Sequence, residues 1–525
     1  MKVLISDAVA PACVDILSSE GIEADVQTGL STEQLRHLIG QYDGLIVRSA
    51  TKVTREVIEA ASRLKVIGRA GAGVDNIDVS AATHRGIVVM NTPGGNTVST
   101  AELSFSMILA LSRNIPQATT ALKAGTWNRK KYTGVEVQGK TLGIIGVGKV
   151  GREVAVRARA FGMNVLGYDP FIVEEVASKL GVELVSLENL YARSDYITIH
   201  TPLNDQTRNL LSEDELARCK TGVRIINCAR GGIVDEAALL RAIESGKVAG
   251  AALDVFAQEP PTCWDLIRRE EVICTPHLGA STAEAQTTVA LQIARQIATF
   301  LKNGTVQNAV NLTPMDAAIY DKIRTYVELA EKIGSLQVQL SKGRLKNIAV
   351  EYRGEILDYP TSPVTAAVLK GALAGSSDIP LNLVNAPVIA QERGIQIEEI
   401  RHSEHENYLN LITVTYRTDR EERIVSGTIF GKNDPRIVRI NEYHFDARPE
   451  GNMLFCGNED VPGVIGRIGT LLGDNGINIA RMSWGREQPG GKAVTVLNLD
   501  NPVPDHVLTQ ITAQPNILWA RRAKL

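Results

Sequence analysis

The fold is decided by one stretch, which reads Leu-Gly-Ile-Ile-Gly-Val-Gly-Lys-Val-Gly over residues 142–151. An apolar strand, predicted over Thr141–Ile145, leads directly into glycines with the spacing Gly-x-Gly-x-x-Gly. The first, Gly146, permits a tight turn, Gly148 lets the backbone approach a pyrophosphate, and Gly151 lets the following helix lie close to the sheet. The free N–H groups at the start of that helix favour phosphate. The stretch therefore predicts a dinucleotide-binding βα unit.

The residues after this unit favour NAD over NADP. A helical stretch, Lys149–Phe161, leads to a second apolar strand, Asn164–Tyr168, which ends in Asp169, 18 residues after Gly151. A carboxylate at this point accepts hydrogen bonds from the ribose hydroxyls and repels a 2′-phosphate. The alternative is an ordinary glycine-rich turn, but such a turn does not require the preceding strand, the helix and the terminal acid together.

The composition is that of a globular protein with several domains. The chain has 525 residues, which suggests three or four domains, and a net charge of −3, which does not favour nucleic-acid binding. Its six cysteines include no Cys-x-x-Cys pair, which argues against a zinc site and against a disulfide framework. Free cysteines of this kind fit a reducing compartment. Met1–Asp7 predicts a strand rather than a signal peptide, and no apolar run approaches the ~18 residues that span a bilayer. We expect a cytoplasmic protein with no membrane partner.

The order of apolar and helical stretches predicts an α/β protein: two Rossmann-like or flavodoxin-like parallel-sheet domains, followed by two α+β domains. Two long helices, Thr97–Ala124 and Ala283–Lys302, are expected at the crossings between the first two domains, with cofactor and substrate in the cleft. We expect a substrate-binding domain at 1–96 with 281–310, an NAD-binding domain at 97–280, a third domain at 311–450 and a compact βαββα-like unit at 451–525.

Two basic residues, Arg48 and Arg69, stand at the ends of predicted strands in the first domain. Ligands of open parallel sheets gather at the carboxyl ends of the strands, so both are candidate anion holders. For either arginine alone, a surface ion pair is the simpler interpretation. The sequence Gly71-Ala72-Gly73 beside Arg69 favours an anion site, because glycines let backbone N–H groups come close to a ligand.

Three loops of the second domain carry residues that could act on a substrate. Arg230 lies in Asn-Cys-Ala-Arg-Gly-Gly, Glu259 follows a predicted strand, and His277 lies in Thr-Pro-His-Leu-Gly-Ala-Ser-Thr. A histidine that transfers protons needs a carboxylate to fix its tautomer, and an arginine can hold a substrate carboxylate with two hydrogen bonds. Two interpretations stay open, because spacing does not decide between them: an Arg–Glu–His site, or three unrelated loop residues.

A charged segment in the third domain contains His402 and His405 among several acids. A metal site is one interpretation of this segment, and a solvated charged loop is the other. No ligand spacing repeats, so the sequence predicts no metal.

Six motifs and three later segments have counterparts in one known family. The motifs are Arg69–Asn76, Asn91–Asn96, Gly146–Gly151, Asn227–Asp235, Ala252–Pro261 and Pro276–Glu284. Through them the chain resembles the D-isomer-specific 2-hydroxyacid dehydrogenases and, within that family, the long phosphoglycerate dehydrogenases, over essentially its whole length. Val384–Gly394 is similar to the intervening domain of the long enzymes, and Asp460–Gly463 with Gly476–Asn478 is similar to an ACT domain, a small amino-acid-binding module. The resemblance makes both α+β domains regulatory.

The resemblance implies NAD-dependent oxidation of 3-phospho-D-glycerate to 3-phosphohydroxypyruvate, the first committed step of L-serine biosynthesis. By this analogy His277 takes the proton of the C2 hydroxyl while a hydride passes from C2 to the nicotinamide. Glu259 would orient His277 and stabilise its charged form. Arg230 would hold the substrate carboxylate and polarise the developing carbonyl.

The resemblance also assigns the ligand contacts. Substrate contacts fall on Arg48, Arg69, Gly71, Asn96 and Arg129, the last from a neighbouring subunit. Cofactor contacts fall on Ala72, Gly146, Gly148, Lys149, Val150, Gly151, Asp169, Thr201, Cys228, Ala229, Arg230, Asp254, His277, Gly279 and Ala280. The family often has Thr where this chain has Ala72, so one hydroxyl contact is lost.

An effector site for L-serine would fall on Asn458, Asp460 and Asn478. Serine-inhibited relatives commonly have an aromatic residue at position 458, so this chain departs from their pattern there. Family members of this build are tetramers, and we therefore expect a homotetramer.

Two other functions fit parts of the sequence. The same scaffold serves reductases of glyoxylate, hydroxypyruvate or 2-oxoglutarate, but Arg48 and Arg69 favour a phosphorylated substrate. The C-terminal binding proteins, transcriptional corepressors, use this fold to sense NADH without catalysis. They lack an ACT-like tail, which favours the enzyme.

Overall fold

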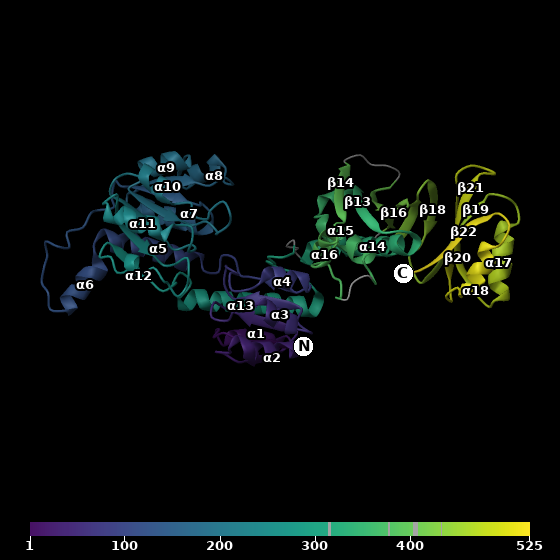
Figure 1. Ribbon diagram of the computed structural model, residues 1–525, viewed down its shortest axis with the longest axis horizontal. Helices are drawn as coiled ribbons and strands as arrows, with labels where there is room; N and C mark the ends of the chain where they lie inside the picture. Colours follow the sequence, from purple (N-terminus) through teal and green to yellow (C-terminus); the bar gives the residue numbers. More distant parts are fainter. Residues whose placement is uncertain (313–316, 376–378, 403–407, 432) are drawn as a thin grey trace.

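The computed structural model describes residues 1–312, 317–375, 379–402, 408–431 and 433–525. These residues form four β-sheets, each with its own helices, arranged along the length of the molecule (Figure 1). The seven-stranded unit lies at one end and the four-stranded unit at the other, with the five- and six-stranded units between them. The α/β prediction, with two parallel-sheet units followed by two α+β units, is confirmed.

The five-stranded unit has the flavodoxin-like order β2-β1-β3-β4-β5, with all neighbours parallel. Its elements are β1 (Lys2–Ile5), α1 (Ala12–Ser19), β2 (Glu23–Val26), α2 (Thr32–Leu38), η1 (Ile39–Gln41), β3 (Gly44–Val47), α3 (Arg55–Ala60), β4 (Val66–Arg69), α4 (Val79–His84) and β5 (Val88–Met90). Helix α13 (Ala283–Asn303) packs on this sheet so closely that a Cβ on Gly68 would lie 2.5 Å from Ile297. The sequence does not predict β2, because this edge strand has no buried residue.

The seven-stranded unit has the order β12-β11-β10-β9-β6-β7-β8, again fully parallel. The strands are β6 (Thr141–Ile145), β7 (Asn164–Tyr168), β8 (Glu183–Leu184), β9 (Tyr196–Ile199), β10 (Val223–Asn227), β11 (Val248–Leu253) and β12 (Val272–Cys274). The helices are α7 (Lys149–Ala160), α8 (Glu174–Lys179), α9 (Leu187–Arg193), α10 (Glu213–Arg218), α11 (Glu236–Glu244) and α12 (Trp264–Ile267). The strand order reverses between β6 and β9, where such sheets bind their ligands.

The prediction of one helix over Thr97–Ala124 is wrong. The structure has α5 (Thr97–Ser112) and α6 (Ile115–Lys123), separated at Asn114, whose φ of 52° is left-handed. The carbonyl of Ser112 accepts the N–H of Val135 at 2.9 Å instead of continuing the helix. Helix α6 has no buried residue and projects from the unit in Figure 1.

The two crossings between the parallel-sheet units are tied together at one peptide. Ser99 Oγ and Thr100 Oγ1, in the first turn of α5, both donate to the Gly279 carbonyl oxygen, at 2.9 and 3.1 Å. Gly279 lies four residues before α13, which continues along the five-stranded unit. These two crossings, which we call the hinge, are therefore attached to the loop that carries His277.

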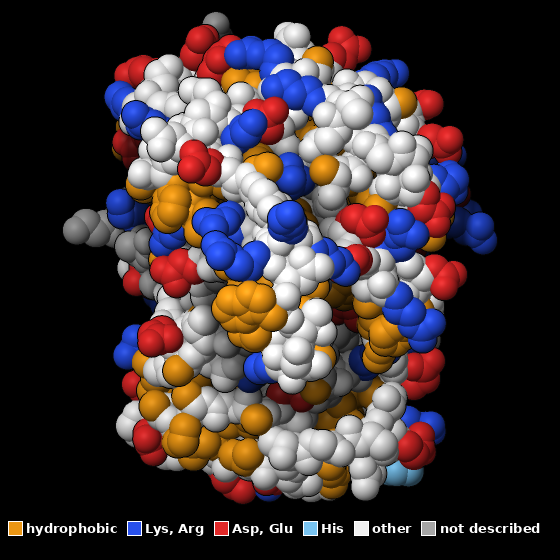
Figure 2. All heavy atoms as spheres, turned by 90° about the vertical axis from the view of Figure 1, so that its left-hand side faces the viewer, with side chains coloured by type: hydrophobic (Ala, Val, Ile, Leu, Met, Phe, Trp, Pro, Cys, Tyr) orange, Lys and Arg blue, Asp and Glu red, His pale blue; other side chains and the backbone are white. Residues whose placement is uncertain are grey.

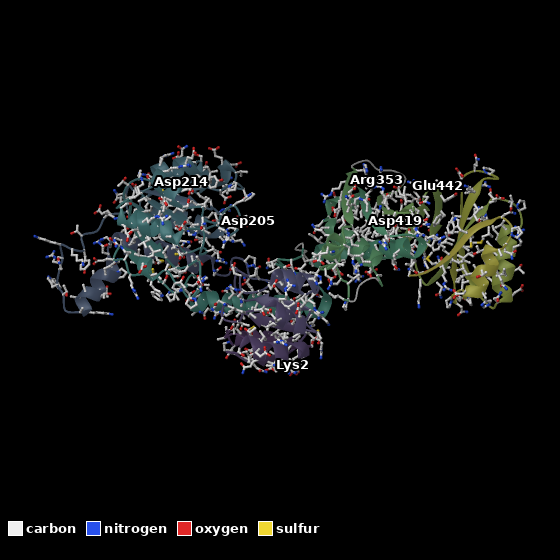
Figure 3. All side chains as sticks on the ribbon, viewed as in Figure 1. Lys2, Asp205, Asp214, Arg353, Asp419 and Glu442 are labelled. Atoms are coloured by element: carbon white, nitrogen blue, oxygen red, sulfur yellow. The ribbon has the colours of Figure 1, made fainter. Side chains whose placement is uncertain are left out.

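The two remaining units are α+β. The six-stranded sheet has the order β14-β13-β15-β16-β17-β18, with only β13 and β14 parallel among its described pairs. Its elements are α14 (Ala317–Leu340), β13 (Leu345–Gly354), η2 (Glu355–Asp358), α15 (Ser362–Ala372), α16 (Ala386–Glu392), β14 (Gln396–His402), β15 (Asn410–Thr418), β16 (Glu422–Phe430), β17 (Asp434–Ile440) and β18 (Tyr443–Ala447). Glu442, labelled in Figure 3, lies near the junction with the last unit.

The last unit is βαββαβ, with the sheet order β20-β21-β19-β22. Its elements are β19 (Asn452–Glu459), α17 (Val464–Asp474), β20 (Ile479–Arg486), β21 (Lys492–Leu499), α18 (Asp505–Thr512) and β22 (Ile517–Lys524). The predicted βαββα pattern omits β22, because basic residues interrupt its apolar alternation. One sheet face packs on the six-stranded unit through buried residues that include Phe455 and Val496.

Candidate active site

The glycine loop has the geometry that a dinucleotide requires. Gly146 has φ 93°, and a Cβ there would lie 2.7 Å from the carbonyl oxygen of His200. A Cβ on Gly151 would lie 2.1 Å from the Gly146 oxygen, so α7 packs tightly under the loop. A Cβ on Gly148, by contrast, meets nothing within 4 Å. The loop is closed toward the sheet and open at Gly148, where a pyrophosphate can approach the N-terminus of α7.

Asp169 is positioned beside this loop. Its Oδ2 accepts the Val147 N–H at 2.9 Å, and its Oδ1 accepts the Phe171 N–H at 2.9 Å. These bonds fix the carboxylate between the end of β7 and the glycine turn. Each carboxylate oxygen can accept a further hydrogen bond, so ribose hydroxyls can still be bound.

The structure brings His277 and Glu259 together. The imidazole Nδ1 and the carboxylate Oε2 are 2.7 Å apart, and the Glu259 Oε1 accepts the Phe256 N–H at 3.2 Å. Burial raises the pKa of Glu259, but the hydrogen bond and charge of His277, with the Phe256 N–H and Arg230, lower it more, so the net pKa is below its usual value. Glu259 therefore stays ionised, and its bond fixes the tautomer in which Nδ1 carries the proton.

Asp254 fixes the backbone that carries His277. It accepts the Thr275 hydroxyl and the Leu278 N–H, both at 2.6 Å, and the Gly279 N–H at 2.9 Å. Burial raises the pKa of Asp254, and these hydrogen bonds oppose that shift. His277 has φ 55°, a left-handed conformation that is uncommon for a residue with a side chain. The hydrogen bonds that Asp254 accepts hold the loop in this conformation.

Arg230 follows β10 and reaches across to the five-stranded unit. The Asn227 side chain holds its backbone, donating to the Arg230 carbonyl at 2.9 Å and accepting the Ala229 N–H at 3.1 Å. The guanidinium pairs with Asp75, with Nε 3.1 Å from Oδ2. Asp75 lies within the Arg69–Asn76 motif, but its pairing with Arg230 could not be predicted from the sequence.

A cavity of about 610 Å³ joins the two units at this site. Its lining includes His277 and Glu259 from one unit and Arg48 and Arg69 from the other. Burial lowers the pKa of Arg69 to about 10, and repulsion from Arg230 and Arg48 adds to that effect. The Arg69 Nε is buried without a hydrogen-bond partner. This wall of the cavity is suited to an anion, which would offset the repulsion among these arginines.

Neighbouring backbone makes room for these arginines. Gly71 has φ 152°, and a Cβ there would lie 1.7 Å from the Arg69 Nη1, so a side chain at this position would displace the Arg69 guanidinium. Asp7 accepts the N–H of Arg48 at 2.5 Å and so fixes the loop after β3, a role that could not be predicted from the sequence. The feature of the sequence that could have pointed to Asp7 is its position just after the first strand.

The other assigned residues lie at several places around the cleft. Lys149 Nζ donates to the Pro93 carbonyl at 3.3 Å, and the Ala72 carbonyl accepts the Asn91 amide at 2.5 Å. The Asn96 amide donates to Thr100 at 3.2 Å, in the hinge. Cys228 is buried against Met107, and the Thr201 hydroxyl is buried without a partner. Ala280 lines the cavity, whereas Val150 and Ala229 are half-buried and are not part of its lining.

Arg129 lies away from the cavity. It belongs to the exposed segment after α6, close in sequence to Trp127, which is 77% exposed. Figure 2 views this end of the molecule and shows basic side chains gathered beside hydrophobic ones. The structure therefore does not bring Arg129 to the active site of its own chain.

The three residues assigned to an effector do not converge within one chain. Asn458 is buried and accepts the Thr495 hydroxyl at 3.1 Å. Asp460 precedes α17 and pairs with Arg486 at 3.2 Å, whereas Asn478 follows α17 and donates to Asp500 at 2.7 Å. Asp460 and Asn478 thus lie at opposite ends of an 11-residue helix.

The sequence predicts neither a metal-ligand cluster nor a helix that spans a membrane for the described part of the chain, and none of either kind is found among these residues. No cluster of three His, Cys, Asp or Glu side chains suited to a metal occurs there. His402 pairs with Glu351 at 3.5 Å, and His405 lies outside the described residues. None of the described helices is long and apolar enough to cross a bilayer.

Three family models match successive parts of the chain. The NAD-binding domain of the D-isomer specific 2-hydroxyacid dehydrogenases matches residues 105–279, the D-3-phosphoglycerate dehydrogenase intervening domain matches 322–441, and the ACT domain matches 452–516. D-3-phosphoglycerate dehydrogenase of Methanocaldococcus jannaschii is 45% identical over 518 residues, or 98% of each chain. The enzyme of Archaeoglobus fulgidus is 44% identical over the whole of both chains. The chain belongs to the D-3-phosphoglycerate dehydrogenase family.

Solved structures match the dehydrogenase half of this family member. A glyoxylate reductase from Paecilomyes thermophila is 35% identical, with a TM-score of 0.54, and covers 59% of this chain and 98% of its own. D-lactate dehydrogenase from Aquifex aeolicus, complexed with NAD and lactic acid, is 27% identical, with a TM-score of 0.52, over 58% of this chain and 96% of its own. The glycine loop and Asp169 fit the NAD-binding assignment that these matches give.

Proposed function

We propose that the protein oxidises 3-phospho-D-glycerate to 3-phosphohydroxypyruvate with NAD, as the first step of L-serine biosynthesis in the cytoplasm. One observation carries this proposal. A single cavity has the hydrogen-bonded His277–Glu259 pair on one side and Arg48 and Arg69 on the other. The first pair can move a proton, and the two arginines can bind a phosphate.

His277 acts as the base. The Nδ1–H of His277 donates to the Glu259 carboxylate. Nε2 is therefore unprotonated and accepts the proton of the C2 hydroxyl while the carbonyl forms. Bound NAD supplies the acceptor for the hydride that leaves C2. The Glu259 carboxylate compensates the positive charge that arises on the imidazole, and in the reverse direction Nε2 returns the proton.

Different arginines bind the two anionic ends of the substrate. Arg230 binds the carboxylate beside C2, where its positive charge also stabilises the developing carbonyl oxygen. Arg48 and Arg69 bind the phosphate. Burial, and after it repulsion from Arg230 and Arg48, lowers the pKa of Arg69, and a bound phosphate would offset both effects, which favours binding at this wall.

A neighbouring copy of the chain completes the site in this account. Helix α6 has no buried residue, and Trp127 after it is largely exposed, which suits a surface that another copy covers. Arg129 would then enter the cavity of that copy, within a homotetramer. Arg129→Gln is expected to raise the KM for 3-phospho-D-glycerate, and an unchanged KM contradicts this assignment.

The ACT unit would bind L-serine between two copies, since Asp460 and Asn478 lie apart in one chain. Asp460 from one copy and Asn478 from another would share the amino acid. Initial velocity measured against rising L-serine tests this. Falling velocity supports the site, and constant velocity up to millimolar L-serine contradicts it.

NADH formation tests the main proposal. The protein with NAD and 3-phospho-D-glycerate is expected to produce NADH, and NADP is expected to serve poorly. Glyoxylate, hydroxypyruvate and 2-oxoglutarate are offered with NADH in parallel. Faster reduction of any of these than of 3-phosphohydroxypyruvate contradicts the proposal.

A further inference from the structure

An ion pair crosses the cleft between the two parallel-sheet units. Arg230 stands after β10 of the seven-stranded unit, and Asp75 stands after β4 of the five-stranded unit. The Arg230 Nε lies 3.1 Å from the Asp75 Oδ2. The substrate-binding arginine of one unit is therefore held by a carboxylate of the other.

The contacts of Arg230 fix the plane of its guanidinium. Nε pairs with Asp75, and Nη1 donates to the Ala229 carbonyl at 2.7 Å. Nη2 lies against Gly73, where a Cβ would be only 2.1 Å away. A guanidinium has five donors, so these contacts orient the group and leave further N–H groups for a ligand.

Asp75 also stands among positive charges. Its charge opposes the lowering of the Arg69 pKa that burial, Arg230 and Arg48 cause. Without Asp75, electrostatic repulsion from Arg69 would push the Arg230 guanidinium out of its position beside Gly73.

We propose that Asp75 is a positioning residue, which holds the Arg230 guanidinium in the orientation that binds the substrate carboxylate. The assignment rests on the proposed function, because it takes Arg230 as the carboxylate-binding group. Asp75 does not touch the substrate in this account and acts only through Arg230. It also couples the approach of the two units to the placement of Arg230.

The exposure of Asp75 makes the proposal testable without loss of folding. Its side chain is 71% exposed, and ion pairs of exposed groups contribute little to folding stability. The effect of removing the carboxylate is therefore expected in turnover rather than in thermal stability. A small displacement of a binding group is sufficient to lower turnover strongly.

Steady-state kinetics of Asp75→Asn, Asp75→Glu and Glu59→Gln test the assignment in the full-length protein. Asp75→Asn is expected to lower kcat/KM for 3-phospho-D-glycerate about tenfold, with NAD affinity and melting temperature unchanged. Asp75→Glu keeps the carboxylate and is expected to recover most of the loss. Glu59→Gln removes an exposed carboxylate from α3 of the same unit and is expected to have no effect.

A double-mutant cycle separates positioning from a general charge effect. In Arg230→Lys, which lacks the paired Nε, adding Asp75→Asn is expected to change kcat/KM less than twofold. A further tenfold loss in that background would overturn the proposal, as would wild-type kinetics in Asp75→Asn itself.

Binding of oxalate, a small dicarboxylate, to the protein with NADH gives a readout that requires no turnover. Asp75→Asn is expected to weaken oxalate binding about as much as it lowers kcat/KM, and unchanged binding contradicts the assignment. If the unaltered protein does not oxidise 3-phospho-D-glycerate, the proposed function fails, and the oxalate measurement still decides the role of Asp75.

Discussion

The two walls of the active-site cavity differ in how far their polar groups are satisfied. On the seven-stranded side, His277 is bonded to Glu259, and Asp254 accepts three hydrogen bonds from the loop around it. On the five-stranded side, the Arg69 Nε is buried without a partner, and burial with two neighbouring arginines lowers the pKa of Arg69 to about 10. The histidine wall therefore has its hydrogen bonds in place without a ligand, whereas the arginine wall keeps a buried donor unpaired and is suited to an anion.

The difference has a physical reason. Proton transfer depends on a fixed tautomer and direction, which a prior hydrogen-bond network provides. Anion binding gains from groups that repel one another until the ligand arrives, because binding then relieves the repulsion. Variants on the two walls should therefore fail in different ways.

The largest effect is expected from His277→Ala. Loss of the base should lower kcat by about 10²- to 10⁴-fold, while NAD binding is retained, because the glycine loop does not depend on the imidazole. Steady-state kinetics and a fluorescence titration with NADH measure the two quantities. His37→Ala, an exposed histidine on α2, is the matched control. Turnover near the parental rate would exclude His277 as the base.

Arg69→Gln should lose substrate affinity rather than the chemical step. Hydrogen bonds to charged groups contribute about 1.5–3 kcal/mol, so the KM for 3-phospho-D-glycerate should rise about 10- to 100-fold. Unphosphorylated D-glycerate should be affected much less. Because Arg69 is buried beside two other arginines, the melting temperature of the ligand-free protein should not fall. Arg36→Gln on α2 serves as the control, and equal losses for both substrates would contradict the phosphate assignment.

Asp169→Ala should change the choice of cofactor by a smaller amount. Removing the carboxylate should reduce the preference for NAD over NADP by about tenfold, or ~1.4 kcal/mol. The same change removes the acceptor of the Val147 and Phe171 N–H groups, so some stability is lost as well. Asp169→Asn keeps an acceptor oxygen and separates the two effects. A constant NAD/NADP ratio in both variants would refute this role.

The smallest effect is expected in how the melting temperature of Glu259→Gln depends on pH. The pKa of Glu259 in the folded protein is below its ordinary 4.5, so its stabilising contribution is present above that value and is lost as pH falls through the folded pKa. The difference in melting temperature between the parent and Glu259→Gln should therefore shrink as pH falls from about 5.5 to about 3. A difference that grows in this range would contradict the lowered pKa.

The fold of the parallel-sheet units could be predicted where burial leaves a periodic signal. The strands Lys2–Ile5, Gly44–Val47 and Thr141–Ile145 are found at the predicted residues, since each is almost wholly buried. The edge strand β2 has no buried residue and leaves no such signal. The break at Asn114 depends on the Val135–Ser112 hydrogen bond, which local propensity cannot show.

The candidate site, like the fold, could be predicted only in part from the sequence. The sequence identified His277, Glu259 and Arg230 as loop residues, but the hydrogen bond between His277 and Glu259 depends on β11 and β12 being neighbours in the sheet. Asp75 could not be found from spacing, because its partner lies on another unit, 155 residues along the chain. A motif shows that a residue is present, whereas a pairing across a cleft depends on how the units are oriented.

The ratio of kcat/KM for 3-phospho-D-glycerate to kcat/KM for D-glycerate tests the contrast between the two walls most directly. The unaltered protein is expected to favour the phosphorylated substrate by about 100-fold or more, because a phosphate satisfies the arginine wall while both substrates use the same base. Equal values for the two substrates would contradict the account, since the arginines would then play no part in binding.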